Sequence, residues 1–235
     1  MRPIGDGVCS VCGERLVSLH VFSGAHGEPR CGLCRRLEPP FVKATAYGSY
    51  ESGLRDLIHM LKYQSVRPAA NVLGRMLAEV LDGLRSSVGD VELVVVPVPL
   101  HTAKSRQRGF NQAEMIAKIA LKLVGAPGKY LLGSHTLERT RDTQSQIGLT
   151  RHQRRENLRG AFRVRQPEAI AGHEVLLVDD VFTTGTTVAE CARVLRRAGA
   201  SRVWVATVAR TLKADAQFAH LGPSEEIQMT QAAHG

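Results

Sequence analysis

The sequence predicts an α/β protein with a mainly parallel, twisted sheet flanked by helices. Three short apolar segments have the composition of strands that are buried in a sheet covered on both faces. Amphipathic helices separate these segments, and such alternation indicates βαβ units with right-handed crossovers. Four of the five cysteines lie in the first 40 residues, which predicts a small additional N-terminal module. A chain of 235 residues is long enough for one main domain and such a module.

The expected elements follow one another from about residue 45. The first helix carries leucine or isoleucine at i, i+3, i+4 and i+7 from Leu54, and Ser52 is in position to cap it. Further helices are expected from about Asn71 and from about Asn111, and another at 187–198, where Gly199 ends it. The expected strands cover 93–98, 175–179 and 202–208, with two weaker ones at 131–137 and 161–165.

The N-terminal module contains two C-x2-C pairs, CSVC and CGLC, separated by the 18 residues 13–30. This spacing is typical of a four-thiolate zinc site, because each pair places two sulfurs on one side of a tight turn and two turns complete a tetrahedron. Two disulfides or four unrelated buried thiols are the alternatives, and disulfides fit poorly with the absence of a secretion signal. We expect a zinc ribbon with a structural zinc ion bound by Cys9, Cys12, Cys31 and Cys34.

Pro39 and Pro40 mark the boundary of this module, because consecutive prolines disfavour helix on both sides. We expect a zinc-binding module at 1–40, the main domain at 41–212 and a poorly ordered C-terminal tail at 213–235. No apolar run approaches the roughly 18 residues of a spanning helix, and the N-terminus lacks the pattern of a signal peptide. The expected location is cytoplasmic, without membrane insertion.

The segment VDDVFTTGTT combines two acids with a threonine-rich loop. Asp179 and Asp180 come at the end of an apolar strand, and ligands of open parallel sheets bind beyond the carboxyl ends of the strands. Two neighbouring carboxylates suit a vicinal diol such as that of ribose. The loop at 183–187 offers hydroxyls, backbone N–H groups, a glycine and a helix N-terminus, which together suit a phosphate. A diol and a phosphate on one ligand describe a ribose 5-phosphate unit.

Two other interpretations of this segment are weaker. A polar turn with an N-capping threonine explains one threonine but not four with a carboxylate pair. A phosphorylatable receiver domain also has paired acids at a strand end, but it needs about two more strands and a phospho-acceptor aspartate downstream. Of the 55 residues after Asp180, only Asp215 is an aspartate, and it does not end an apolar strand.

The formal net charge of +9 is concentrated in one part of the chain. Residues 101–165 contain 14 Lys and Arg against four acids and therefore hold the whole excess. Such a block attracts nucleic acid or a phosphate-rich ligand, although a solvated basic surface is the plain alternative. Arg151, Arg155 and Arg159 recur at i, i+4 and i+8, so a helix would place them on one stripe that a polyanion could neutralise.

Five segments together resemble the ComF family in order and spacing. They are the four-cysteine module, LRDLIHMLKY (54–63), VPVPLHTAKSRQRGFNQAE (96–114), RTRDTQSQIGLTRHQRRENLRGAF (139–162) and VDDVFTTGTT (178–187). The last of these resembles the phosphoribosyl pyrophosphate signature of type I phosphoribosyltransferases. The resemblance extends from Cys9 to about Thr211 and leaves out the tail.

The resemblance implies a type I phosphoribosyltransferase-like fold that binds phosphoribosyl pyrophosphate with Mg²⁺. Asp179 and Asp180 would hold the ribose hydroxyls, and a diphosphate loop would lie at about 100–104. The 5-phosphate would be held by Thr183, Thr184, Gly185, Thr186 and Thr187, and the diphosphate would be neutralised by Lys104, Arg106 and Arg108. Residues 139–146 would form the mobile flap that excludes water. The reaction would displace pyrophosphate through an oxocarbenium-like state, which needs positioning and leaving-group stabilisation more than an activated nucleophile.

ComF-like proteins are associated with natural competence, so the resemblance also implies single-stranded DNA and a competence helicase as partners. The arginine stripe would follow the strand, and Lys62, Tyr63 and Phe110 would add cationic or stacking contacts. Two hypotheses stay open at this point. The protein is either a working phosphoribosyltransferase or a non-catalytic DNA-binding competence module that keeps phosphoribosyl pyrophosphate as an effector or a vestige.

Overall fold

A five-stranded, entirely parallel sheet forms the centre of the computed structural model, which describes residues 7–16, 28–125, 128–141, 143 and 148–212. The strand order is β1-β7-β6-β2-β3. The strands are β1 (Ala44–Ser49), β2 (Leu93–Pro97), β3 (Tyr130–Leu132), β6 (Glu174–Phe182) and β7 (Arg202–Arg210). The predicted α/β class with a mainly parallel sheet is confirmed.

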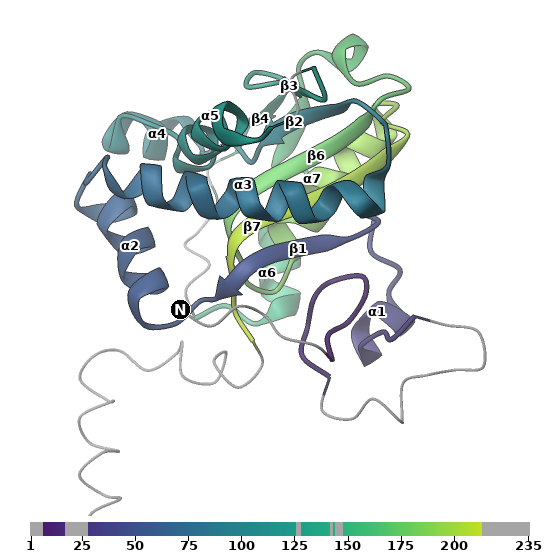
Figure 1. Ribbon diagram of the computed structural model, residues 1–235. Coiled ribbons are helices and arrows are strands. Elements are labelled where there is room, and N and C mark those ends of the chain that lie inside the picture. Colours follow the sequence, from purple (N-terminus) through teal and green to yellow (C-terminus); the bar gives the residue numbers. More distant parts are fainter. Residues whose placement is uncertain (1–6, 17–27, 126–127, 142, 144–147, 213–235) are drawn as a thin grey trace, which may run out of the picture.

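Helices cover both faces of the sheet (Figure 1). One face packs against α2 (Ser52–Tyr63), α3 (Ala69–Val88) and α5 (Gln112–Leu123), and the other against α7 (Thr186–Arg197) and α6 (Arg151–Leu158). The side chains of successive strand residues point to opposite faces of the sheet. Leu176 and Val178 pack toward α3, whereas Val175 and Leu177 pack toward α7. This two-sided burial is the reason for the continuous apolar runs in the strands.

Two short strands, β4 (Leu137–Arg139) and β5 (Phe162–Val164), form a separate antiparallel pair. The expectation of one strand at 131–137 was therefore wrong, because a turn at 133–136 separates β3 from β4 and the two strands belong to different sheets. The expected cap of α2 was also wrong. Its N-cap is Glu51, and Ser52 is the first helical residue, with a φ of 41°.

Two elements that the sequence analysis missed lie at functionally relevant places. Strand β1 forms the edge of the sheet beside β7, and helix α4 (Thr102–Arg108) follows β2. Figure 1 shows α2 and α4 together beyond the carboxyl ends of the strands. This is the edge at which open parallel sheets bind ligands.

The cysteine-rich module, which includes α1 (Gly32–Arg36), joins the core of the main domain on the α7 side of the sheet. The Ala44 N–H donates to the Val11 carbonyl at 2.7 Å, and the Val42 N–H donates to the Val203 carbonyl at 2.8 Å. The module is thus bonded to the strands as well as packed on them. Residues 213–235, where a tail was expected, lie outside the described part of the chain. Within the described part, no helix is long and apolar enough to cross a membrane.

Candidate functional site

The two adjacent acids lie within β6, where its neighbour β2 has already ended. Pro97, the last residue of β2, pairs with Val178, and the Val98 N–H donates to the Val178 carbonyl at 2.8 Å. Beyond this point β6 remains paired with β7 as far as Phe182. The expectation that the strand ends at Asp179 was therefore wrong. The acids gain access to the carboxyl edge because β2 has ended beside them.

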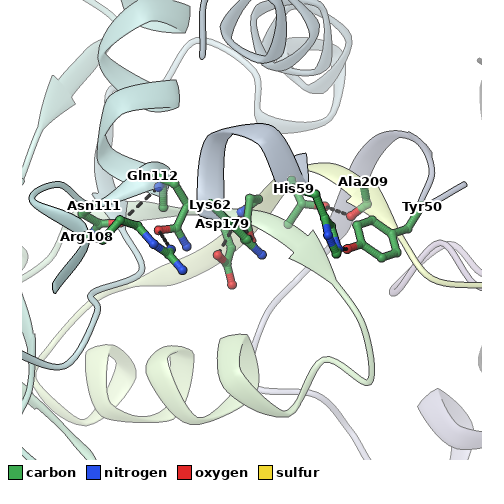
Figure 2. A network of polar contacts seen from close by, with 11 residues as sticks. Tyr50, His59, Lys62, Arg108, Asn111, Gln112, Asp179 and Ala209 are labelled. Atoms are coloured by element: carbon green, nitrogen blue, oxygen red, sulfur yellow. Dashed lines mark hydrogen bonds and ion pairs between the residues drawn. The ribbon is translucent and has the colours of Figure 1, made fainter. Parts of the chain in front are cut away.

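Asp180 is buried and forms an ion pair with Lys62 of α2. The distance from Lys62 Nζ to Asp180 Oδ2 is 2.6 Å, and the Asp180 side chain is 5% exposed. Burial disfavours the charge of Lys62, but the ion pair with Asp180 and the nearby charge of Asp179 together outweigh it and raise the pKa of Lys62. Figure 2 shows Lys62 beside Asp179. The sequence analysis expected Lys62 to contact DNA, whereas the structure places it on the acid pair.

Asp179 is held against the backbone of its neighbour. Its Oδ1 accepts a hydrogen bond from the Asp180 N–H at 2.8 Å. Burial, followed by the nearby charge of Asp180, raises the pKa of Asp179 to about 8, although Lys62 opposes this shift. One ammonium group is thus insufficient to stabilise two adjacent carboxylates, one buried and one partly buried. Hydroxyl donors or a further cation would favour the charged form of Asp179.

The threonine-rich loop turns at Gly185, which is the N-cap of α7 and has a φ of 73°. A Cβ at this position would lie 2.6 Å from Cζ of Phe182, so both the backbone conformation and the packing require glycine. The Thr184 and Thr186 hydroxyls are 2.8 Å apart. Gly185 has no side chain with which to cap the first turn of α7. A helix start of this kind suits an anion.

The cationic side of the site begins on α4. The expected diphosphate loop at 100–104 was wrong in its conformation, because His101 caps α4 and accepts a hydrogen bond from the Ala103 N–H at 3.4 Å. Lys104 and Arg106 are exposed on this helix, and no described contact joins them to the acids. Arg108 lies closer to the acids, since its guanidinium carbon is 5.8 Å from the ring centroid of Tyr63, the neighbour of Lys62.

Further polar side chains extend this group along the carboxyl edge (Figure 2). Arg108 donates to Gln112 Oε1 at 2.5 Å, and His59 Nε2 is 3.0 Å from the Tyr50 hydroxyl. Tyr63 is 66% exposed between them. The sequence signal for this group was the polar face of LRDLIHMLKY, opposite its leucines, but the pattern alone did not indicate what that face touches.

The expected flap begins at Arg139, the last residue of β4. Arg139 forms an isolated bridge with His101, and its guanidinium donates to the Thr143 hydroxyl. The start of the segment thus lies beside the first turn of α4. Residues 142 and 144–146 of the expected flap lie outside the described residues.

The predicted three-arginine stripe is shorter than expected. Helix α6 ends at Leu158, and Arg159 has left the helical conformation at the C-cap. Arg141 donates to the carbonyls of Asn157 and Arg159 at 3.0 and 2.8 Å, at the C-terminal end of the helix. Arg155 is exposed on the helix, and Arg151 is its first residue. The extension of the stripe to i+8 was therefore wrong.

The four N-terminal cysteines form a buried cluster. The ligand atoms of Cys9, Cys12, Cys31 and Cys34 all lie within 4.8 Å of one another. The Sγ atoms of Cys12 and Cys31 are 3.7 Å apart, and a zinc tetrahedron with bonds of about 2.3 Å has edges of about 3.8 Å. All four are free thiols, so the disulfide alternative was wrong. This donor set fits a structural zinc ion. The fifth cysteine, Cys191, is fully buried in the core, as expected.

Asp179→Asn is expected to stabilise the ligand-free protein at pH 8 and to have little effect at pH 4. The pKa of Asp179 in the folded protein lies above its value of about 4 in an unfolded chain, so stability falls as the pH rises between these values. An amide of the same shape avoids this loss. We expect the gain in Tm at pH 8 to be at least about 2–4 °C, which corresponds to about 1 kcal/mol.

Thermal unfolding of both proteins at pH 4 and pH 8 measures this difference. Asp56→Asn, on the exposed side of α2, is the matched control. A lower Tm of the Asp179 variant at pH 8 would contradict the unfavourable burial of this carboxylate.

Comparison with known proteins shows which families this chain resembles. Residues 112–219 match the phosphoribosyl transferase domain family. The chain is 36% identical over 213 residues to the DNA utilization protein YhgH of Salmonella typhimurium, with 88% of this chain and 91% of the relative covered. It is 30% identical over 216 residues to competence protein F of Haemophilus influenzae, with 87% and 91% covered. Competence protein ComFC of Bacillus subtilis is 24% identical over 185 residues, with 72% of each chain covered.

The order of the elements, the acid pair before a glycine-capped helix and the extent of these similarities lead to one conclusion. The chain has a type I phosphoribosyltransferase-like domain and belongs to the ComF family of competence and DNA-utilization proteins.

Proposed function

We propose that this protein binds phosphoribosyl pyrophosphate at the carboxyl edge of its sheet and acts as a phosphoribosyltransferase-like protein in DNA uptake. The observation that carries the proposal is the placement of two adjacent carboxylates, Asp180 buried and Asp179 partly buried, on the strand that leads into the glycine-capped start of α7. One strand, one loop and one helix thereby offer acceptors for a diol and donors for a phosphate.

Each part of the ligand has a partner in this arrangement. Asp179 and Asp180 accept hydrogen bonds from the ribose hydroxyls, and the loop from Thr183 to Thr187 holds the 5-phosphate. Arg108 is the nearest cation for the diphosphate, and Lys104 reaches it from the exposed face of α4. A bound Mg²⁺ would neutralise part of the diphosphate charge, and carboxylate oxygens are suitable partners for this ion. Lys62 holds the Asp180 carboxylate in place before the ligand arrives.

In a transfer reaction, the bond between the anomeric carbon and the diphosphate oxygen breaks, and the acceptor forms the new bond at the same carbon. The diphosphate leaves with the electron pair, so its charge is what the protein must stabilise. Arg108 is positioned for this by Gln112. No side-chain nucleophile is required, which agrees with the deep burial of Cys191 and the high pKa that burial gives its thiol.

Calorimetric titration with phosphoribosyl pyrophosphate and Mg²⁺ tests the site. The wild-type protein is expected to show saturable binding, and Asp179→Asn with Asp180→Asn should abolish it, because a neutral pair loses the charge-assisted bonds. The double variant Glu51→Gln with Asp56→Asn is the control, because it removes the same amount of charge. Glu51 is the N-cap of α2, and Asp56 lies on this helix, as Lys62 does. A folded wild-type protein without binding would overturn the proposal.

We also propose that residues 1–40 are a zinc-binding module and that 41–212 form the phosphoribosyltransferase-like domain. Elemental analysis is expected to find one zinc per chain and none after Cys31→Ser, since three thiolates bind zinc far more weakly than four. Cys191→Ser is the control, because this thiol lies outside the cluster. A fully folded wild-type protein without metal would contradict the zinc assignment.

A second candidate function, single-stranded DNA binding, is favoured by exposed arginines on α6, at its C-cap and on β5. Arg155 is exposed, and the side chains of Arg159 and Arg163 are 79% and 71% exposed. In this function the ligand of the first site would be an effector, and a cytoplasmic competence helicase would be the protein partner. The names of the relatives, which refer to competence and DNA utilization, support this context.

Arg155→Glu should weaken retention of a single strand and lower the slope of log affinity against log salt by at least about 1, because a phosphate contact is lost. Filter binding at several salt concentrations measures both. Asp180→Asn and Arg75→Glu, the latter exposed on α3 across the sheet, should leave retention intact. Equal retention by the Arg155 variant would contradict the role of α6.

A further inference from the structure

Arg210, the last residue of β7, is a charged side chain that is only 3% exposed. Burying a guanidinium group is costly unless its donors are bonded. Two of its nitrogens are bonded to the cysteine module. One donates to the carbonyl of Cys12, and Nη2 donates to Glu14 Oε2 at 2.8 Å. The end of the strand beside the candidate site is thus tied to a cysteine of the cluster.

The guanidinium of Arg210 also contacts the ring of Phe182. Its guanidinium carbon lies 4.9 Å from the ring centroid, and the two residues are register partners in β7 and β6. The Thr211 N–H donates to the Phe182 carbonyl at 3.0 Å, and Phe41 packs edge-on against the ring. Phe182 is therefore fixed from several sides.

Phe182 in turn supports the loop before α7. Its Cζ lies only 2.6 Å from the position that a Cβ of Gly185 would occupy, so the ring is in close contact with the glycine that starts the helix. Contacts thus run without interruption from Cys12 through Arg210 and Phe182 to Gly185. The first residue belongs to the cysteine cluster, and the last belongs to the phosphate loop.

We propose that Arg210 is a positioning residue that couples the occupancy of the four-cysteine metal site to the shape of the phosphate loop. The proposal rests on the proposed function. A bound metal fixes the turn that contains Cys12, where the Gly13 N–H donates to the Cys9 carbonyl at 2.8 Å. Without the metal this turn is released, and the guanidinium loses its carbonyl acceptor. Because a buried charge does not stay without partners, Arg210 and the Phe182 ring then shift, and the loop at Gly185 loses its support.

A thermodynamic cycle tests the coupling. The affinity for phosphoribosyl pyrophosphate with Mg²⁺ is measured by calorimetry for the wild type and Arg210→Met, each loaded with zinc and depleted of it, with Mg²⁺ restored afterwards. Zinc removal is expected to weaken binding by the wild type about 10-fold. Arg210→Met should show a similar loss with zinc present and no further loss on depletion. Arg210→Lys should recover part of the affinity.

Arg202→Met is the matched control. Arg202 is at the other end of β7, its side chain is 61% exposed, and it pairs with Glu174 at 3.7 Å. This variant should respond to zinc removal like the wild type. If Arg210→Met does not fold, Phe182→Leu replaces it in the cycle, because this variant removes the next contact in the series from Cys12 to Gly185. The coupling would be overturned if the losses of affinity caused by Arg210→Met and by zinc removal multiplied. It would also be overturned if zinc removal did not change the affinity of the wild type.

Hydrogen exchange of the amides at 183–188 gives a second readout that needs no ligand. Zinc removal should accelerate exchange at these amides in the wild type, and in Arg210→Met the exchange should be fast in both states. Unchanged exchange in the wild type would refute the coupling. A wild type that binds no phosphoribosyl pyrophosphate would refute the proposed function, and the exchange result would still decide the inference.

Discussion

The central strand β6 extends beyond the end of its neighbour β2 but stays paired with β7, and the candidate site depends on this difference in length. Where β2 ends, the side chains of Asp179 and Asp180 lie at an open edge while their backbone is still held in a sheet. The same continued pairing carries β6 to Phe182, so the turn at Gly185 starts from a fixed position. A shorter β7 would leave both the acids and the loop without a rigid base.

Electrostatics then decides how the site is organised. Two adjacent carboxylates with little solvent repel each other and resist ionisation, and Lys62 compensates for only one of them. The remaining imbalance favours a ligand that brings hydroxyl donors and a cation. The burial of the Asp179 carboxylate is therefore unfavourable, and such a ligand would relieve it. In the proposed function, Arg108 would be the cation that stabilises the leaving diphosphate.

The cysteine module is continuous with this arrangement. Its four sulfurs lie within 4.8 Å of one another, its core is shared with the α7 side of the sheet, and Arg210 bonds it to the end of β7. Through these contacts the module of this protein is bonded to the strand that ends beside the candidate site. This arrangement is compatible with both catalysis and a sensing role in DNA uptake.

The sequence by itself determined the parallel α/β fold, the cysteine cluster and the segment with Asp179, Asp180 and Gly185. Those signals are local, because continuous apolar strands, C-x2-C spacing and a turn that requires glycine depend on neighbouring residues. Only the tertiary structure decided that Lys62 pairs with Asp180, that residues 100–104 begin a helix and that Arg210 joins the module to Phe182. These contacts connect residues distant in the chain, and their partners depend on strand order and strand length, which no local pattern of residues encodes.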